Sequence, residues 1–346
     1  MKQVFNREKD IVILGIESSC DETAAAVSVN GTQILSNVIY SQIDLHTLYG
    51  GVVPEIASRM HIAKINQVIK KALADAKVTL DDLDAVAVTY GPGLVGALLV
   101  GVSEAKAIAW AKDISLVGVN HIKGHVCANY IEHPQLKPPF LCLVASGGHT
   151  HLVKATDYTD YEIIGRTRDD AAGEAYDKIA RAIGLGYPGG PKVEKAARSG
   201  DPEAFAFPRA KIDENPYDFS FSGVKSAVLN TINSCKMKGM EIDEKLQADV
   251  AASFQAAVID SLRERVLMAI DEFGIRDFAM AGGVASNQAL RGALKEACEQ
   301  EGVNFYCPSP IYCTDNAAMI AVAGYFEYRD GNLAGLDLNA VPGLRM

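Results

Sequence analysis

The chain has 346 residues, of which 49% are hydrophobic and 22% are charged. This composition is typical of a folded globular protein and excludes global disorder, and the length suffices for two domains. The formal net charge of −10 means that the surface as a whole repels phosphate backbones. A nucleic-acid ligand would therefore need a partner protein or a local basic patch, for which the scattered candidates are Arg209, Lys211 and Lys225.

Three further features concern the cellular compartment. The seven cysteines form no Cys-x-x-Cys pair, which indicates reduced thiols in a cytosolic protein. Residues 1–10 are polar and lack the apolar core of a signal peptide. The longest apolar run, residues 94–110, is interrupted by Ser103, Glu104 and Lys106, so it predicts a buried helix rather than a membrane span. We therefore expect a cytoplasmic protein.

The first half of the chain predicts the order β-β-β-α-β-α-β-α. Strands are expected over residues 11–16 and 23–29, and Asn30-Gly31 predicts a tight turn into a third strand over residues 32–40. The remaining predicted elements are helices over 54–76 and 94–110, strands over 85–89 and 116–119, and a helix that begins near His121.

The second half repeats this theme after a boundary at Pro138-Pro139. A polar stretch from Gly184 to about residue 215 looks like an inserted segment. Because two copies of one topology suggest two lobes, we expect a ligand-binding cleft between them. The predicted elements are strands over 140–145, 149–155, 161–165, 277–281 and 304–307, and helices over 170–183, 244–273, 286–299 and 315–328.

Two histidines, His121 and His125, lie four residues apart in a predicted helix. Residues at this spacing share one helix face, so both imidazoles can bind the same metal ion. Polar residues on a half-buried face are the alternative. A zinc-protease helix would carry a glutamate after the first histidine as general base, and Ile122 occupies that position. The pair therefore indicates metal binding without peptide hydrolysis.

Two turns at matching positions of the two halves indicate phosphate binding. Residues 15–23 read Gly-Ile-Glu-Ser-Ser-Cys-Asp-Glu-Thr, and residues 146–150 read Ser-Gly-Gly-His-Thr. Glycine allows phosphate oxygens to approach backbone N–H groups. A plain tight hairpin is the alternative, and the agreement between the two turns favours the phosphate.

Residues 281–287, Ala-Gly-Gly-Val-Ala-Ser-Asn, follow a predicted strand and open a helix. The glycines would let a nucleotide lie against the backbone, and Asn287 could bind a ribose, phosphate or acyl group. The stretch is not the G-x-G-x-x-G fingerprint of dinucleotide-binding folds. An ordinary turn with Ser286 as helix N-cap is the alternative.

Carboxylates lie at two other helix starts. Asp315 could cap the last long helix, or it could complete a His-His-Asp metal site. Asp170, Glu174 and Asp177 share one face of a helix that is either a solvated acidic start or a ligand face. Beyond that helix, residues 189–191, Gly-Gly-Pro, form another loop where backbone could approach a ligand.

Taken together, these residues resemble the bacterial tRNA threonylcarbamoyladenosine transferase family, TsaD, once described as O-sialoglycoprotein endopeptidases. The matching motifs run in order over nearly the whole chain, which makes a chance match very improbable. They are residues 15–23, 90–93 (Tyr-Gly-Pro-Gly), 121–125, 146–150, 169–177, 187–191, 219–225 (Phe-Ser-Phe-Ser-Gly-Val-Lys), 282–287 and 313–316 (Cys-Thr-Asp-Asn).

The resemblance implies an α/β fold of the actin/Hsp70/sugar-kinase type (ASKHA), with two RNase-H-like lobes around a nucleotide cleft. We expect an N-terminal lobe over residues 1–135, on which residues 316–346 pack back. The C-terminal lobe would span residues 136–315, with an inserted segment around residues 184–243.

The resemblance also implies the reaction, the site and the partners. A threonylcarbamoyl group would move from threonylcarbamoyl-AMP to N6 of adenosine 37 in tRNAs that read codons beginning with A. His121, His125 and Asp315 would hold one divalent metal ion, iron or zinc. An AMP- or ATP-type ligand would bind at Val144, Ala145, Ser146, Gly147, Gly148, Asp177, Gly190 and Asn287.

Expected partners are tRNA, a TsaB-like paralogue, a TsaE-like ATPase and an upstream threonylcarbamoyl-AMP synthase. No membrane is implied. Asp21 and Glu22 are candidates for the catalytic base that takes the proton of the adenine amine, with Asp177 as a third. The competing interpretations are a small-molecule kinase of the same fold, an Hsp70-like scaffold that only hydrolyses ATP and, least favoured, a metalloprotease.

Overall fold

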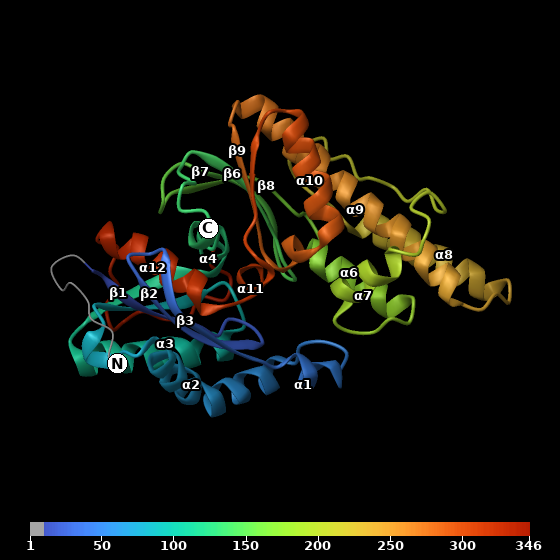
Figure 1. Ribbon diagram of the computed structural model, residues 1–346. Helices are drawn as coiled ribbons and strands as arrows, with labels where there is room; N and C mark the ends of the chain where they lie inside the picture. The colour runs from blue at the N-terminus through green and yellow to red at the C-terminus, as the bar shows by residue number, and fades with distance from the viewer. Residues whose placement is uncertain (1–9) are drawn as a thin grey trace. The chain divides into compact units, whose positions relative to one another are not determined.

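A computed structural model of the chain describes residues 10–346 (Figure 1). The polar segment of residues 1–9, where we find no signal-peptide pattern, lies outside the described residues. The chain divides into two compact units. Unit 1 comprises the described residues up to Pro138 together with Asp157–Tyr161 and Pro308–Met346, and unit 2 comprises Pro139–Thr156 and Glu162–Cys307.

Unit 1 is built on a five-stranded mixed sheet. The strands are β1 (Val12–Glu17), β2 (Glu22–Val29), β3 (Gln33–Ser41), β4 (Ala85–Gly91) and β5 (Ser115–Asn120), in the order β3-β2-β1-β4-β5. The first three strands pair antiparallel, and β4 and β5 run parallel to β1. Such a sheet needs cover on both faces, and its near-continuous apolar strands reflect this.

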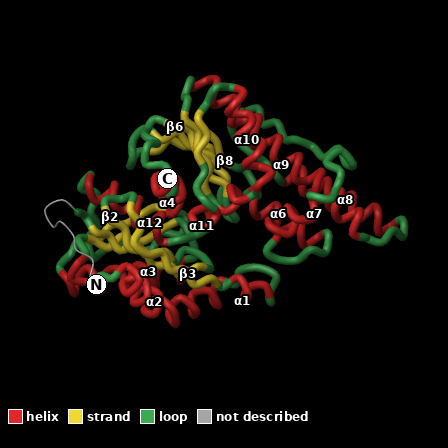
Figure 2. Tube along the Cα trace, viewed as in Figure 1, coloured by secondary structure: helices red, strands yellow, loops and turns green. Residues whose placement is uncertain are grey.

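Helices cover each face of the unit 1 sheet, as Figure 2 shows. Alternate residues such as Leu14 and Val27 face α2 (Pro54–Ala76) and α3 (Val95–Lys112). The intervening small residues Ala24 and Ala26 face α12 (Ala317–Arg329) on the other side. A Cβ at Gly15 would lie 2.4 Å from the carbonyl oxygen of Ala317, so glycine permits this close approach of α12. The remaining helical segments of unit 1 are α1 (Ile43–Thr47), a 3₁₀ turn (Leu80–Asp82), α4 (His121–Cys127), α5 (Asn129–Glu132) and α11 (Pro310–Cys313).

Unit 2 repeats the topology of unit 1. Its strands are β6 (Phe140–Ala145), β7 (Thr150–Ala155), β8 (Tyr161–Arg166), β9 (Asp277–Ala281) and β10 (Asn304–Tyr306), in the order β10-β9-β6-β7-β8. The duplicated order predicted from the sequence is therefore confirmed. Its helical segments are α6 (Ala172–Ala182), α7 (Gly189–Ala197), α8 (Ser222–Met237), α9 (Glu244–Phe273), a 3₁₀ turn (Gly283–Ser286) and α10 (Gln288–Gln300).

The stretch predicted as an inserted segment, around residues 184–243, contains helices α7 and α8. Each helix has a buried apolar stripe, for example Val224 and Val228 in α8. These helices form because they pack on α6 and α9, so tertiary contacts decide their structure.

Two predictions about the chain as a whole can be compared with the structure. All seven cysteines are free thiols, as expected. Among residues 10–346, every helix is too short or too polar to cross a lipid bilayer.

Candidate metal centre and donor site

The two histidines lie on one short helix at the end of β5. Strand β5 ends at Asn120, whose side-chain oxygen accepts hydrogen bonds from the N–H groups of Ile122 and Lys123 and so caps α4. His121 is the first residue of α4 and His125 lies one turn later. Both side chains are buried, with 6% and 0% exposure. The predicted helix and its shared face are confirmed.

Asp315 lies in the loop between α11 and α12, immediately before the helix start. The cap of α12 is Asn316, whose side-chain oxygen accepts from the N–H of Met319 at 3.0 Å. The question left open by the sequence is therefore answered: capping is done by the next residue, and the Asp315 carboxylate is directed to the histidines instead.

The three side chains converge. One carboxylate oxygen of Asp315 lies 3.5 Å from Nε2 of His121 and 3.2 Å from Nε2 of His125. Two atoms that each lie about 2.1 Å from one ion at the tetrahedral angle are about 3.4 Å apart, so these spacings match ligands of a common metal. The ligand atoms of all three residues lie within 4.8 Å of one another.

The surroundings of His125 also fit a metal. Its side chain is fully buried, Nδ1 has no hydrogen-bond partner among residues 10–346, and the 3.2 Å approach of Nε2 to Asp315 does not have the geometry of a hydrogen bond. Leaving a buried polar atom without a partner costs about 1–3 kcal/mol. A metal ion bound at Nε2 would provide the missing interaction at that atom.

Glu17 is a site residue that sequence reasoning missed. It ends β1 with a fully buried side chain, and one of its carboxylate oxygens lies 3.0 Å from Nδ1 of His121. Thr89 donates to the same carboxylate oxygen at 2.6 Å, and the N–H of Ser19 donates to the other. A carboxylate on Nδ1 fixes the tautomer in which Nε2 is free to bind a metal. The missed signal is a charged residue inside an otherwise apolar strand.

The charges around His121 perturb its pKa. Burial lowers the pKa, but Asp315 and Glu17 outweigh burial and raise it to about 9. For Glu17, burial acts to raise the pKa, and the contact with His121 keeps it below the usual value of 4.5. The metal-free site therefore holds its positive charge on His121, and a metal ion would replace that proton.

Asp21 and Glu22 belong to the same acidic surroundings. Burial, Asp21 and Asp315 raise the pKa of Glu22 well above 4.5. Asp21 is 8% exposed. Mutual destabilisation of carboxylates marks a region of negative potential, which favours a bound cation.

The residues predicted to bind an AMP- or ATP-type ligand all lie in unit 2. β6 and β9 are parallel neighbours in which Val144 pairs with Ala281, so both strands end at the same edge. A Cβ at Gly282 would lie 2.3 Å from the carbonyl oxygen of Ala145, and the N–H of Gly173 in α6 donates to the carbonyl of Ser146 at 3.2 Å. The loop after β6, the turn after β9 and the start of α6 thus adjoin one another.

At four positions around this edge, neither packing nor backbone conformation requires the residue to be glycine. A Cβ at Gly147, Gly148, Gly190 or Gly283 would meet nothing within 4 Å among the described residues, and none of the four has a left-handed backbone. Since neither packing nor backbone geometry calls for glycine there, the space left by the missing side chains is open to a ligand. The first N–H groups of α6 and α7 are already used within unit 2, since Ala172 donates to the hydroxyl of Thr150 and Gly189 donates to Asp177.

Two of the residues predicted to bind the AMP- or ATP-type ligand, Asp177 and Asn287, already contact other parts of the chain. Asp177 accepts a hydrogen bond from the N–H of Gly189 at 2.6 Å, which ties α6 to α7. Asn287 caps α10 by accepting from the N–H of Leu290 and donates to Gln255. The alternative in which Ser286 is the cap is wrong, because the 3₁₀ turn extends through Ser286 and moves the helix start to Gln288.

The acidic start of α6 is largely neutralised by neighbours. Asp170 binds Lys178 at 2.8 Å and also Lys225, and Glu174 binds Lys178. Asp169 accepts from the hydroxyls of Ser220 and Ser222 and so holds the start of α8. The acidic residues before α6 thus tie α6 to α8, and the start of α6 also adjoins the loop after β6. Among the basic candidates for nucleic acid, Arg209 pairs with Asp260 and Lys225 with Asp170.

Comparisons with solved structures identify the fold. The chain matches component A of (R)-2-hydroxyglutaryl-CoA dehydratase from Acidaminococcus fermentans with a TM-score of 0.51 and 18% identity, over 92% of this chain and 99% of that one. Full-length HypF, in a phosphate- and nucleotide-bound form, matches with a TM-score of 0.62 and 15% identity, over 92% of this chain and 55% of that one. At these identities the likeness concerns the fold alone, and it confirms the predicted ASKHA class.

Comparisons of sequence identify the family. The family model "TsaD: tRNA N6-adenosine threonylcarbamoyltransferase" matches residues 33–322. Proteins named tRNA N6-adenosine threonylcarbamoyltransferase from Clostridium beijerinckii and Clostridium novyi are 58% and 59% identical, over 97% and 98% of this chain and 98% of each relative. With the His-His-Asp cluster and the duplicated fold, these matches leave one conclusion: the chain belongs to the TsaD family of tRNA N6-adenosine threonylcarbamoyltransferases and is a transferase.

Proposed function

We propose that this transferase takes its threonylcarbamoyl group from threonylcarbamoyl-AMP and delivers it to N6 of adenosine 37 in tRNAs reading codons that begin with A. One divalent ion, iron or zinc, would be held by His121, His125 and Asp315. The observation that carries the metal assignment is the convergence of two buried imidazoles on one carboxylate oxygen at 3.5 and 3.2 Å. When bound, the ion supplies positive charge that stabilises the negative charge developing at the attacked carbonyl.

The donor is proposed to bind in unit 2. N–H groups of Gly147 and Gly148 would bind the phosphate, because their missing side chains leave the backbone accessible. The residues from Val144 to Ser146 would line the same edge. Asp177 would act by holding the start of α7 so that Gly190 lies open to the ligand. Asn287 would contact the bound threonylcarbamoyl-AMP and would also fix the turn after β9.

The chemical step is an acyl transfer. The N6 nitrogen of adenosine attacks the carbamoyl carbon, a C–N bond forms, the bond from that carbon to the phosphate oxygen breaks, and AMP leaves. The N6 amine is a weak nucleophile, so holding both reactants in place must supply much of the rate. The proton lost from N6 would go to Glu22 or Asp21, and the raised pKa of Glu22 makes its carboxylate a stronger base than an ordinary one.

The partners follow from the chemistry and charge. An acidic chain of net charge −10 needs help to hold tRNA, which a TsaB-like paralogue and a TsaE-like ATPase would provide. The donor would come from a threonylcarbamoyl-AMP synthase. We place the enzyme in the cytoplasm because its tRNA substrate is there.

The direct test is reconstitution. The chain, its presumed partners and the synthase are incubated with tRNA, threonine, bicarbonate and ATP, and the nucleosides are analysed by mass spectrometry. We expect threonylcarbamoyladenosine with the wild type and a loss of at least a hundredfold with His125→Ala. Absence of product at saturating metal and partners would refute the proposal.

The same preparation separates the competing functions. A metalloprotease would cleave casein in a way that His121→Ala abolishes, and a kinase would transfer phosphate from ATP to a small hydroxyl compound. The site disfavours the metalloprotease, because Ile122, at 1% exposure, occupies the position of the protease glutamate.

A further inference from the structure

The C-terminal residues 332–346, here called the strap, follow α12 and cross the ends of β4 and β5. The N–H of Ala334 donates to the carbonyl of Leu116 at 2.8 Å, and the N–H of Val341 donates to the carbonyl of Tyr90 at 2.7 Å. The N–H of Gly93 in turn donates to the carbonyl of Pro342 at 3.1 Å. The strap thus docks on residues 90–93, the Tyr-Gly-Pro-Gly motif to which the proposed reaction assigns no role.

Gly91 is the closest point of this dock. A Cβ there would lie 2.1 Å from the carbonyl oxygen of Val341 and 2.8 Å from Cβ of Leu344. The backbone of Gly91 lies outside the left-handed region, so its own conformation does not require glycine. Glycine at this position is explained by the strap.

Asn120 connects the strap to the metal helix. Asn120 is 5% exposed, and its side-chain amide makes hydrogen bonds at both of its ends. The Oδ1 atom accepts from the N–H of Ile122 at 2.9 Å and so caps α4, while Nδ2 donates to the carbonyl oxygen of Arg345 at 3.3 Å. The side-chain amide of Asn120 is thus held at one end by the start of α4 and at the other by the strap.

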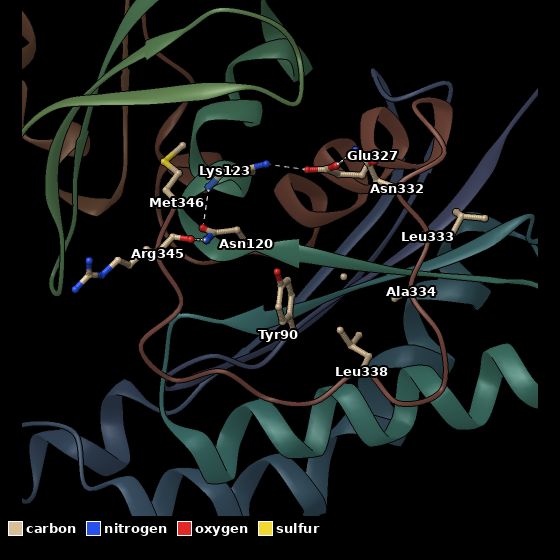
Figure 3. A pocket seen from close by; sticks show the side chains of 11 residues that line it. Tyr90, Asn120, Lys123, Glu327, Asn332, Leu333, Ala334, Leu338, Arg345 and Met346 are labelled. Atoms are coloured by element: carbon tan, nitrogen blue, oxygen red, sulfur yellow. Dashed lines mark hydrogen bonds and ion pairs between the residues drawn. The ribbon is translucent and has the colours of Figure 1, made fainter.

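A pocket of about 490 Å³ lies under the strap (Figure 3). Tyr90, Asn120 and Lys123 line it together with Leu338 and Arg345 of the strap. Ala334 and Leu338 pack against the core of unit 1, and hydrogen bonds at Val341, Pro342 and Arg345 fix the end of the strap. Helix α4 has seven residues, too few to hold its place without tertiary contacts.

We propose that the strap is a positioning element for the metal centre, with Asn120 as the positioning residue through which it acts. Docking on residues 90–93 and on Asn120 fixes the direction in which β5 continues into α4, and therefore where His121 presents Nε2. The inference rests on the metal site of the proposed function.

The test is a double-mutant cycle on the full, metal-free chain titrated with Co²⁺. Asn120→Asp keeps the oxygen that caps α4 but removes the donor to Arg345, and deletion of residues 341–346 removes the strap's anchors at Val341, Pro342 and Arg345 and leaves the one at Ala334. We expect each change to weaken Co²⁺ binding about tenfold, and Asn120→Asp to have no further effect in the truncated chain. Asp243→Ala, which removes the cap of α9, is the matched control and should leave Co²⁺ affinity unchanged.

Two results would overturn the proposal: wild-type Co²⁺ affinity in the truncated chain, or equal effects of Asn120→Asp with and without the strap. Hydrogen exchange of the amides of Ile122 and Lys123 in the metal-free chain gives a second readout. Removing the strap should accelerate it at least tenfold, and unchanged exchange would refute the positioning role. If His125→Ala leaves Co²⁺ affinity unaltered, the proposed metal site is wrong. The hydrogen-exchange measurement, which needs no metal, still tests whether the strap positions α4.

Discussion

At the scale of single residues, the metal centre depends on one buried carboxylate outside the ligand set. Glu17 holds Nδ1 of His121 at 3.0 Å and is itself held by Thr89 and Ser19. Partners of this kind fix the tautomer and the ring orientation of a metal-binding histidine. Glu17 would therefore contribute to metal affinity without being one of the three proposed ligands.

Glu17→Gln tests this role. The amide can present its N–H₂ group to Nδ1, which would favour the wrong tautomer of His121, and we expect a metal affinity about 10- to 100-fold lower. Asp75→Asn, in an exposed pair with Lys71, is the control that removes a carboxylate elsewhere in unit 1. Equal metal affinity in Glu17→Gln and the wild type, measured by chelator competition, would exclude the role.

The sequence alone could predict part of this site. The spacing of His121 and His125 is local, and helical periodicity places both on one face. Asp315 lies 190 residues further along, so no local pattern connects it to them, and only the family resemblance did. Glu17 was missed because its function depends on a cross-strand neighbour and on α4, which become visible only after folding.

At the scale of elements, the site is set by the contact between α12 and its neighbours. Gly124 in α4 comes close to Ile320 of α12, and Gly15 in β1 comes close to Ala317 and Ala321 of the same helix. Since Asp315 directly precedes Asn316, the cap of α12, a displacement of that helix would move the carboxylate relative to the histidines.

Gly15→Ala tests this dependence. The new methyl group would meet backbone atoms of α12 at 2.4 and 2.6 Å, which cannot yield as a flexible side chain could. We expect a loss of about 1–3 kcal/mol in unfolding free energy and weaker metal binding. Gly292→Ala in α10 is the control: it meets nothing within 4 Å in the described part of the chain and should stabilise its helix by about 0.5–1 kcal/mol. A Gly15→Ala variant as stable as the wild type, by urea unfolding, would contradict this account.

Helix prediction succeeded for long helices with a clear start signal and failed for helices whose formation depends on packing. The bounds of α2 and α9 agree with the expected helices over residues 54–76 and 244–273, because each has a long pattern with a proline start or an aspartate cap. Helices α7 and α8 were not predicted, since each gains its stability from α6 and α9 rather than from its own sequence.

At the scale of the whole molecule, unit 1 presents an apolar face. Ile62 of α2 and Val95 and Leu99 of α3 are 66%, 54% and 41% exposed, beside a groove of about 440 Å³. Exposed apolar groups gathered on neighbouring helices mark interaction surfaces. This face is therefore a candidate surface for the protein partner proposed above.

Leu99→Asp should therefore prevent co-elution of the chain with the paralogue in size-exclusion chromatography while leaving its metal content intact. Met237→Asp, on the exposed end of α8, is the matched control and should co-elute as the wild type does. Undiminished complex formation by Leu99→Asp would place the partner elsewhere.

The central claim, that two imidazoles and one distant carboxylate share a single ion, is tested most directly by metal analysis of freshly purified, untagged protein. We expect about one iron or zinc ion per wild-type chain, and an equally large loss of metal in His125→Ala and in Asp315→Ala. Wild-type metal content in Asp315→Ala would contradict it.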